Sequence, residues 1–276
     1  MRRLARRLKS LLLPLWLGAL PFGASCAAEN PPPSTETGGK TSGHAERNGD
    51  RLARDALMRD IERMMRQSAP ETGRSALSPR VRAALEAVDR RDFVPPAQAW
   101  AAYENRPLPI GHGQTISQPF IVAIMTELLD PEPSDVVLEV GTGSGYQAAV
   151  LAKLVSHVYS IEIVAPLAAE SKARLAALGY RNVTVRQGDG YAGWPEHAPF
   201  DKIIVTAAAP TIPPPLIEQL KPGGRMVIPL GAQYAHQDLV IVDKAADGTV
   251  RERRLFAVGF VPLVRPDDAA AGGRSR

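Results

Sequence analysis

The sequence predicts an α/β fold with a doubly wound, mostly parallel sheet that ends in an antiparallel strand pair and follows an N-terminal helical segment. From Asp135 onward, short β-branched runs alternate with longer runs of helical periodicity, a pattern typical of parallel strands joined by crossover helices. Two long strand-like runs close the pattern with only the turn Ala246-Asp247-Gly248 between them, which indicates a hairpin. The chain of 276 residues is 45% hydrophobic and can therefore bury a sizeable core.

The first segment of the chain, residues 1–28, has the layout of a secretory signal. A basic start is followed by an apolar stretch from Leu11 to about Leu20 and then by small residues. The apolar stretch is too short and too interrupted by proline to favour a membrane span. Export with cleavage near Ala28, lipid attachment at Cys26 and a wrongly chosen start codon all remain open. Because Cys26 is the only cysteine, no internal disulfide can form.

The positive formal charge of +4 comes from that same segment. Residues 1–28 hold five of the 33 Lys and Arg side chains and none of the 29 Asp and Glu side chains, so the rest of the chain carries a net charge of −1. The basic composition therefore gives no reason to expect nucleic acid as a partner.

Residues 29–50 are rich in Pro, Gly, Ser and Thr, and we expect a disordered linker there. Residues 51–134 should form a helical segment that supplies the substrate site. Apolar residues at helical spacing indicate a first helix. A second helix should begin after Ser78, which is suited to cap it, with a proline in the first turn. The apolar positions of the first helix are Leu57, Ile61, Met64 and Met65.

Residues 135–264 are expected to form the main domain, followed by a flexible tail over residues 265–276. The expected strands are 136–140, 157–163, 183–187, 202–208 and 225–231, with hairpin strands at 238–244 and 249–264. The expected helices are 148–155, 165–178 and 213–220.

A glycine-rich stretch lies at the end of the first strand, where open α/β sheets bind ligands. Gly141, Gly143 and Gly145 let the backbone turn tightly and approach a ligand closely. Their spacing differs from the G-x-G-x-x-G that lays a pyrophosphate on a helix end, and the charge of Glu139 would suit a cation better. S-Adenosylmethionine carries an amino group and a sulfonium but no phosphate, so it is the favoured cofactor. A turn of purely structural glycines is the alternative.

Two further carboxylates follow the next two strands. Glu162 ends the second strand, where a carboxylate can bind both hydroxyls of a ribose. Asp189 follows the third strand and can accept from an adenine amino group. Each residue taken singly has an alternative explanation. Glu162 could be an exposed glutamate at a strand end, and Asp189 could belong to an ordinary Asp-Gly turn. Together with the glycines they predict one cofactor site, made of Glu139, Gly141, Gly143, Gly145, Glu162, Asp189 and Gly190.

Motifs from about Arg80 to Val264 resemble those of the protein-L-isoaspartate O-methyltransferases, a family of class I S-adenosylmethionine-dependent enzymes. The resemblance implies a Rossmann-like methyltransferase fold, with an S-adenosylmethionine-binding catalytic domain over 135–264. It also implies a repair enzyme that methylates the α-carboxyl of L-isoaspartyl residues in damaged proteins, after which the ester closes to a succinimide that can reopen to aspartate. The motifs are DFVP (92–95), LPIGHGQTISQP (108–119), LEVGTGSGYQAAVLA (138–152), GDGYAGW (188–194), PFDKIIVTAAAP (199–210), LKPGGRMVIPLG (220–231) and FVPLV (260–264).

In this family the serine of the TIS segment is the active-site residue, and the resemblance gives that role to Ser117. The neighbouring Thr115, Ile116 and Gln118 are then expected to bind substrate. An isoaspartyl carboxylate is already ionised at neutral pH, so its attack on the sulfonium needs alignment and no strong base. We therefore expect Ser117 to hydrogen-bond and position that carboxylate. The alternative is a plain helix cap, because a helix is expected from about Pro119.

Other residues carry weaker signals. His112 stands where many family members have glutamine, and we give it no role. Trp194 and Tyr191 follow the Asp189 turn, and core packing explains them better than contact with adenine. No set of His, Cys and acidic residues has metal-ligand spacing, so no metal is expected.

Three rival functions fit parts of the sequence. A serine hydrolase lacks support, because Ser144 stands in T-G-S-G-Y and not in a G-x-S-x-G elbow. A nicotinamide-dependent oxidoreductase is disfavoured by the glycine spacing and by Glu139. An exported, non-catalytic binding protein on the same fold would account for the leader. Four intact residues argue against it: Ser117, Glu139, Glu162 and Asp189.

The leader and the chemistry conflict, because an exported enzyme would lack S-adenosylmethionine. Met58 precedes every motif, so initiation there would still yield the full catalytic region. We therefore expect a cytoplasmic monomer that acts on damaged proteins and peptides, binds no nucleic acid and has no membrane span in its mature chain. An exported or lipid-anchored form is the alternative.

Overall fold

A computed structural model describes residues 42–232 and 235–266 of the chain. The chain divides into two units, Met1–Gly43 and His44–Arg276, and the fold below is that of the second unit. The expectations of a leader over 1–28, of a linker over 29–41 and of a tail beyond 266 concern residues outside this description.

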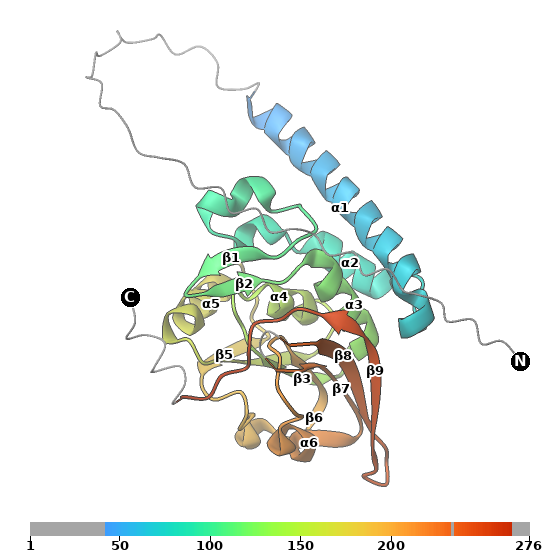
Figure 1. The fold of residues 1–276 in the computed structure, drawn as a ribbon. Helices are drawn as coiled ribbons and strands as arrows, with labels where there is room; N and C mark the ends of the chain where they lie inside the picture. Colours follow the sequence, from blue (N-terminus) through green and yellow to red (C-terminus); the bar gives the residue numbers. More distant parts are fainter. Residues whose placement is uncertain (1–41, 233–234, 267–276) are drawn as a thin grey trace, which may run out of the picture. The chain divides into compact units, whose positions relative to one another are not determined.

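A seven-stranded sheet forms the centre of the unit, with the strand order β5-β4-β3-β6-β7-β8-β9 (Figure 1). Strands β3 to β7 run parallel, β8 is antiparallel to β7, and β9 is antiparallel to β8. The predicted fold class is confirmed, including the antiparallel pair at the end. The strands are β3 (Val136–Val140), β4 (His157–Glu162), β5 (Val183–Gln187), β6 (Phe200–Val205), β7 (Leu220–Leu230), β8 (Gln237–Lys244) and β9 (Val250–Val258).

The strands differ from expectation mainly at two ends. β7 begins at Leu220 and not at position 225, because Leu220 already pairs with Phe200 of β6 ahead of an irregularity in the register. β9 ends at Val258, and residues 259–264 leave the sheet. This segment instead lies beside the loop after β6, where the Ala208 N–H donates to the Val261 carbonyl at 2.8 Å and the Leu263 N–H donates to the Ala208 carbonyl at 2.8 Å.

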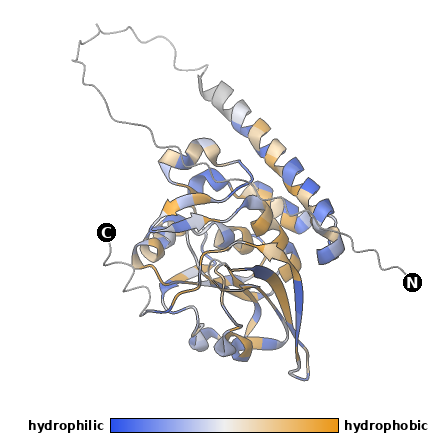
Figure 2. Cartoon of the chain, viewed as in Figure 1, coloured by the Kyte–Doolittle hydropathy of each residue, from blue (hydrophilic) through white to orange (hydrophobic). Residues whose placement is uncertain are grey.

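The sheet separates two layers of buried apolar side chains. Successive strand residues point to opposite faces, so Val137 and Ile204 belong to one cluster while Leu138 and Ile203 belong to the other. Helices α2, α3 and α4 contribute to the first cluster, and α6 contributes to the second. Figure 2 shows apolar residues concentrated in the sheet and polar residues along much of β9. The exposed, highly charged residues 250–254 make β9 an edge strand that resists pairing with another chain.

The helices begin largely where the sequence placed them. Ser78 caps α2 as predicted, because its hydroxyl accepts a hydrogen bond from the Val81 N–H at 3.4 Å. The alternative for Ser117 is wrong, since Gln118 is the N-cap residue of α3 and its side chain makes no capping bond. The helices are α1 (Ser42–Thr72), α2 (Pro79–Ala87), α3 (Pro119–Leu129), α4 (Tyr146–Ala152), α5 (Ala165–Ala177) and α6 (Pro214–Gln219), with 3₁₀ turns η1 (Arg90–Phe93), η2 (Pro96–Ala101) and η3 (Pro195–His197).

Helix α1 starts earlier than the sequence suggested. It begins at Ser42, so the expectation of a disordered linker is wrong for residues 42–50. The physical reason is cooperativity: once the following turns pack against the core, extending the helix adds hydrogen bonds at little further cost. Ile61 and Met65 are fully buried, as predicted for the core face of this helix, whereas Met64 is half-buried and borders a cavity. In the described part of the chain no helix is both long and apolar enough to cross a membrane.

A short hairpin that the sequence did not predict precedes α3. It consists of β1 (Leu108–Gly111) and β2 (Gln114–Ile116). Gly111, His112 and Gly113 in its turn all have positive φ, at 93°, 52° and 70°. Glycine adopts this region without strain, and histidine is among the residues that tolerate it. The glycine-rich stretch before α3 is thus the turn of a hairpin, and the hairpin sets the position of the residues that lead into α3.

Candidate functional site

The glycine loop lies at the carboxyl end of β3, between the neighbouring strands β4 and β6. Strand β4 holds its backbone, because the Gly141 N–H donates to the Ile161 carbonyl at 2.8 Å and the Gly143 N–H donates to the Glu162 carboxylate at 2.8 Å. Gly141 has a φ of 99°, and a Cβ there would overlap the Thr206 hydroxyl, so only glycine fits. The predicted ligand loop therefore stands at the switch point of the sheet.

Glu162 ends β4 with its side chain turned toward this loop. One carboxylate oxygen accepts from the Gly143 N–H and the other accepts from the Val164 N–H at 2.9 Å. Each oxygen has two lone pairs, so each can accept a second hydrogen bond from a ligand. Glu162 also borders the crevice beside the glycine loop, a position that suits the predicted contact with ribose hydroxyls.

Asp189 and Gly190 follow β5, but only Gly190 borders the crevice. The Asp189 carboxylate accepts from the Tyr191 N–H at 2.8 Å, which is the turn geometry that we named as the alternative. A Cβ at Gly190 would overlap the Val140 side chain and lie 3.2 Å from Leu263. The missing side chain at Gly190 therefore keeps the crevice open, and Asp189 stands one residue outside it.

The crevice consists of two small spaces of about 60 and 30 Å³. Thr206, which the sequence analysis missed, borders both, and its hydroxyl donates to the Gly141 carbonyl at 2.6 Å. Residues 261–264 form an outer wall of the first space. Sites for small organic ligands usually have about 300 to 1,000 Å³, so a nucleoside needs more room than these two spaces provide. Two backbone hydrogen bonds to Ala208 hold the wall at 261–264, and the Leu263 carbonyl also accepts from the Tyr191 hydroxyl at 3.1 Å.

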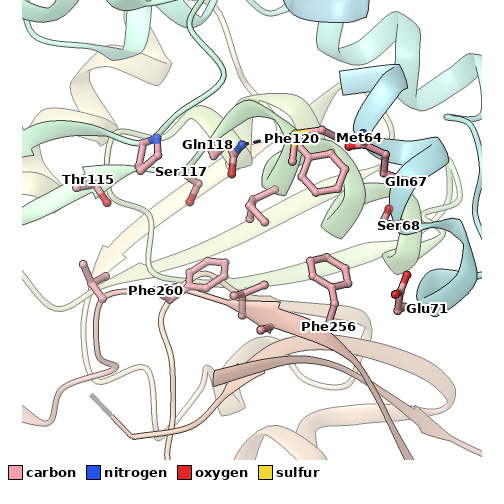
Figure 3. Close-up of a pocket in the computed structure, with 16 residues that line it drawn as sticks. Met64, Gln67, Ser68, Glu71, Thr115, Ser117, Gln118, Phe120, Phe256 and Phe260 are labelled. Carbon is pink, nitrogen blue, oxygen red and sulfur yellow. Dashed lines mark hydrogen bonds between the residues drawn. The ribbon is translucent and has the colours of Figure 1, made fainter. Parts of the chain in front are cut away.

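A larger cavity of about 550 Å³ opens next to the crevice (Figure 3). Thr115 borders this cavity and both parts of the crevice, and Ser117 borders the cavity and the smaller part. The two spaces therefore meet at these residues. Within the described part of the chain, Glu71 is the only charged residue in the wall. The wall is formed by Met64, Gln67, Ser68, Glu71, Pro107, Thr115, Ser117, Gln118, Phe120, Ile121 and residues 256–261.

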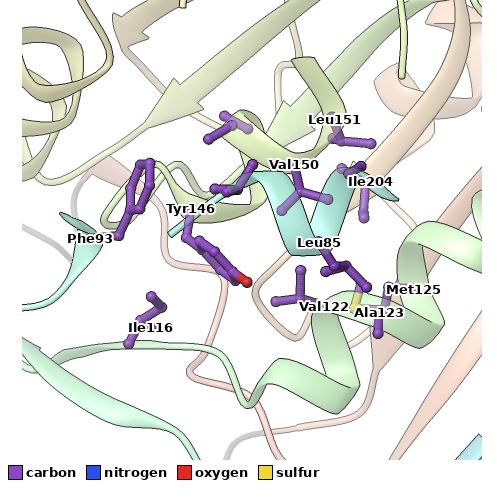
Figure 4. Close-up of a cluster of buried hydrophobic side chains, with 14 of the residues drawn as sticks. Leu85, Phe93, Ile116, Val122, Ala123, Met125, Tyr146, Val150, Leu151 and Ile204 are labelled. Carbon is purple, nitrogen blue, oxygen red and sulfur yellow. The ribbon is translucent and has the colours of Figure 1, made fainter. Parts of the chain in front are cut away.

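Ser117 and its neighbours occupy different environments. The Ser117 hydroxyl has no hydrogen-bond partner among the described residues, while its carbonyl accepts from Arg90. The Gln118 side chain borders the cavity but donates to the Asn105 carbonyl at 3.0 Å, which fixes its orientation. Ile116 is a correction, because its side chain is buried in the core and reaches only the smaller part of the crevice (Figure 4). A strand buries alternate side chains, so Thr115 and Ile116 face opposite sides.

Comparison with known proteins identifies the family. A family model described as protein-L-isoaspartate(D-aspartate) O-methyltransferase matches residues 62–268. The chain belongs to this family. Protein-L-isoaspartate O-methyltransferase 1 of Cupriavidus necator is 59% identical over 208 residues, 75% of this chain and 80% of the relative. Protein-L-isoaspartate O-methyltransferase 2 of a Polaromonas species is 59% identical over 207 residues, 75% of this chain and 98% of the relative.

A solved structure agrees with this assignment. The beta-aspartate methyltransferase of Plasmodium falciparum, in complex with S-adenosyl-L-homocysteine, has a TM-score of 0.64 at 26% identity, over 76% of this chain and 98% of that chain. The resemblance seen in the sequence is confirmed, and with it the enzyme class, a protein-L-isoaspartate O-methyltransferase with S-adenosylmethionine as its methyl donor. The hydrolase, oxidoreductase and non-catalytic alternatives find no support.

Glu139 of this protein-L-isoaspartate O-methyltransferase lies behind the glycine loop and does not border the crevice. One carboxylate oxygen accepts from the Ser160 hydroxyl, which in turn lies 2.6 Å from the Thr142 hydroxyl, and the other is buried without a partner among the described residues. Burial raises the pKa of Glu139 to about 8, against the opposing effect of the Ser160 hydrogen bond. The residue that we expected to face a cationic ligand is therefore, in this structure, a buried carboxyl group behind the glycine loop.

The residues with weaker signals lie outside the centre of this methyltransferase site. Trp194 is buried beneath the Arg186 guanidinium, 4.1 Å from its ring centre, so core packing is confirmed for it. The Tyr191 hydroxyl donates to the Leu263 carbonyl at 3.1 Å and so contacts the wall of the crevice. His112 is exposed on the hairpin turn. Over residues 42–232 and 235–266, no three His, Cys, Asp or Glu side chains converge to hold a metal ion.

Proposed function

We propose that this methyltransferase binds S-adenosylmethionine in the crevice and the isoaspartyl segment of a damaged protein in the larger cavity. The observation that supports the proposal is the junction of the two spaces at Thr115 and Ser117. Methyl transfer requires that donor and acceptor come into direct contact in one orientation. A reaction between ligands of these two spaces would therefore take place beside the Ser117 hydroxyl.

The residues of the crevice fit the cofactor chemically. Gly141, Gly143 and Gly190 leave room for a ligand close to the backbone, and Glu162 has free lone pairs for the ribose hydroxyls. Apolar side chains beside them, including Ile161 and Leu263, suit a planar base. The enclosed volume is too small for the whole molecule, so we expect residues 261–264 to move outward on binding. When bound, S-adenosylmethionine supplies an electrophilic methyl group on its sulfonium.

Ser117 would then act by positioning the substrate. Its hydroxyl can donate to one oxygen of the ionised carboxylate and leave the other oxygen free to attack. No residue needs to remove a proton, because the carboxylate is deprotonated at neutral pH. Phe120, Phe256 and Phe260 line the adjacent cavity and make this part of its wall apolar (Figure 3). In this role Ser117 aligns the reactants and forms no covalent bond.

We also propose that the enzyme acts as a monomer in the cytosol, where its methyl donor is made. Sequencing of the N-terminus of the native protein tests the location. A mature end at Cys26 to Asn30, found in a membrane or periplasmic fraction, would contradict it. Sedimentation velocity of the native enzyme tests the monomer.

The substrate is tested with two peptides that differ only in an aspartyl or isoaspartyl linkage, each offered with tritiated S-adenosylmethionine. Label should enter only the isoaspartyl peptide, and label in both peptides or in neither would refute the proposal. The role of Ser117 is tested with Ser117→Ala, which should lower kcat by about 10- to 100-fold, the effect of losing one hydrogen bond to a charged group. Affinity for S-adenosylhomocysteine should stay within about twofold. The exposed Ser134 provides a control variant, Ser134→Ala, with unchanged kinetics.

A further inference from the structure

Arg90 is the only Lys or Arg in the described part of the chain that is buried, with 2% of its surface exposed. It belongs to η1, and its guanidinium donates to the carbonyl groups of three residues in two segments. One terminal nitrogen donates to the Ala102 carbonyl at 2.7 Å. The other donates to the Arg106 carbonyl and to the Ser117 carbonyl, each at 3.1 Å. The planar, fork-like guanidinium therefore joins the chain after η2 to the active-site serine.

This buried charge has no acidic partner. Arg90 forms no ion pair with any described carboxylate, and its Nε is buried without a hydrogen-bond acceptor among the described residues. Burial lowers the pKa of Arg90 to about 10, so the group remains positively charged at neutral pH. An unpaired buried charge destabilises a fold, and an apolar residue of similar size would avoid that cost. A functional use for the charge would explain the presence of arginine here.

The surroundings of Ser117 suggest that use. No Lys, Arg or His among the described residues lines the large cavity or either part of the crevice. A substrate carboxylate beside Ser117 would therefore meet no cationic side chain of the protein directly. Arg90 is instead bound to the peptide group of Ser117, because it donates to the Ser117 carbonyl at 3.1 Å. Because the cavity wall is largely apolar, the field of this guanidinium is screened less there than in bulk water.

We propose that Arg90 is a positioning residue with two effects: it fixes the Ser117 peptide, and its positive charge favours binding of the ionised substrate carboxylate at Ser117. The inference rests on the proposed role of Ser117. It predicts that the enzyme distinguishes an isoaspartyl peptide from the same peptide with a neutral α-carboxamide, and that this preference depends on the charge at position 90.

The test measures the affinity of the full-length enzyme for both peptides in the presence of S-adenosylhomocysteine, together with kcat for the isoaspartyl peptide. The wild-type enzyme should bind the carboxylate peptide about tenfold more tightly, as expected for a hydrogen bond to a charged group. Arg90→Met keeps a flexible apolar stem in the buried position and removes the guanidinium with its charge, so the preference should fall to about twofold or less. Affinity for S-adenosylhomocysteine should remain within about twofold of the wild-type value.

Arg90→Lys keeps the positive charge but replaces the planar guanidinium by a single ammonium group, which cannot hold all three carbonyls in the same geometry. This variant should therefore retain the preference for the carboxylate while its kcat falls by about tenfold. If Arg90→Met does not fold, this variant carries the test, because loss of its preference or an unchanged kcat would overturn the inference. Arg225 offers a control, since it is partly buried and donates to the Leu128 carbonyl at 3.2 Å away from Ser117. Arg225→Met should leave the preference and the affinity for S-adenosylhomocysteine unchanged.

The outcomes separate this inference from the role of Ser117. If the wild-type enzyme does not distinguish the two peptides, the proposed contact of Ser117 with the carboxylate is wrong, and the inference falls with it. If the wild-type preference exists and persists in Arg90→Met, the inference alone is wrong. Equal weakening of both peptides, or a loss of S-adenosylhomocysteine binding in Arg90→Met, would reduce Arg90 to a purely structural residue.

Discussion

Replacement of Glu139 by Gln removes the buried carboxyl group beneath the glycine loop and leaves a neutral side chain of nearly the same shape. Burial raises the pKa of Glu139 from 4.5 to about 8 in the folded protein. In the unfolded chain the group regains its ordinary pKa, so between these two values the folded state holds a proton that the unfolded state releases. The stabilising contribution of the protonated group is therefore fully present below about pH 4.5 and is lost as pH rises toward 8.

The size of the effect follows from linkage. One proton taken up on folding changes the free energy of unfolding by about 1.4 kcal/mol per pH unit. From about pH 5.5 to about pH 7.5 the wild-type enzyme should therefore lose about 2 to 3 kcal/mol relative to Glu139→Gln, which has no proton to release. Other groups titrate in both proteins, so their contributions cancel in the difference.

Urea unfolding of both proteins at pH 5.5, 6.5 and 7.5 measures this difference, with equal m-values as the condition for comparing them. The exposed Glu218 on α6 provides a control, because Glu218→Gln should change stability equally at each pH. A constant difference between wild type and Glu139→Gln over the whole range would show that Glu139 is ionised in the folded enzyme. In that case the carboxylate would be available to a cation, as the sequence first suggested.

Two further substitutions probe the crevice. Glu162→Gln should weaken S-adenosylhomocysteine binding at least about tenfold. The carboxylate uses both oxygens to accept from the Gly143 and Val164 N–H groups, whereas an amide has only one acceptor oxygen. Isothermal titration calorimetry measures the affinity, and an unchanged value would remove Glu162 from the cofactor site. Gly190→Ala should lower the same affinity by a similar factor, because the added Cβ overlaps the Val140 side chain. The control is Gly49→Ala, where an added Cβ meets nothing within 4 Å. Equal affinities in the two variants would contradict the reasoning.

The glycine loop shows how far local patterns reach. The alternation of apolar runs located β3, and the glycine spacing located the loop after it, because both depend on neighbouring residues only. The same reasoning predicted that Glu139 contacts the ligand, but in the structure its side chain is buried and does not line the crevice. Strand β3 lies in the middle of the sheet with both faces covered, so a residue on it is buried whichever way it points. Position in the sheet depends on contacts between distant segments, which a local pattern does not contain.

The substrate side depended still more on tertiary structure. The FVPLV motif was recognised without a role, and only its backbone pairing with Ala208 shows that it forms a wall of the crevice. Thr206 was expected inside the strand 202–208 and gave no signal of its own, yet it follows the observed strand and contacts the glycine loop directly. The role of Arg90 could not be predicted from the sequence either. Its partners are the backbone carbonyl groups of residues 102, 106 and 117, and every residue has such a group, so no residue type indicates the contact.

The sequence by itself determined the fold class, the family and the positions of the glycine loop, Glu162 and Ser117, because periodicity, glycine spacing and motifs are properties of short segments. The tertiary structure decided which of these groups share a space. It brought Ser117 to the boundary between the cavity and the crevice and kept the Ile116 side chain out of the larger cavity. It also buried Glu139 behind the crevice and left Asp189 one residue outside it. The physical reason is that burial and hydrogen bonding depend on which distant segments pack together, and that is settled by the fold as a whole.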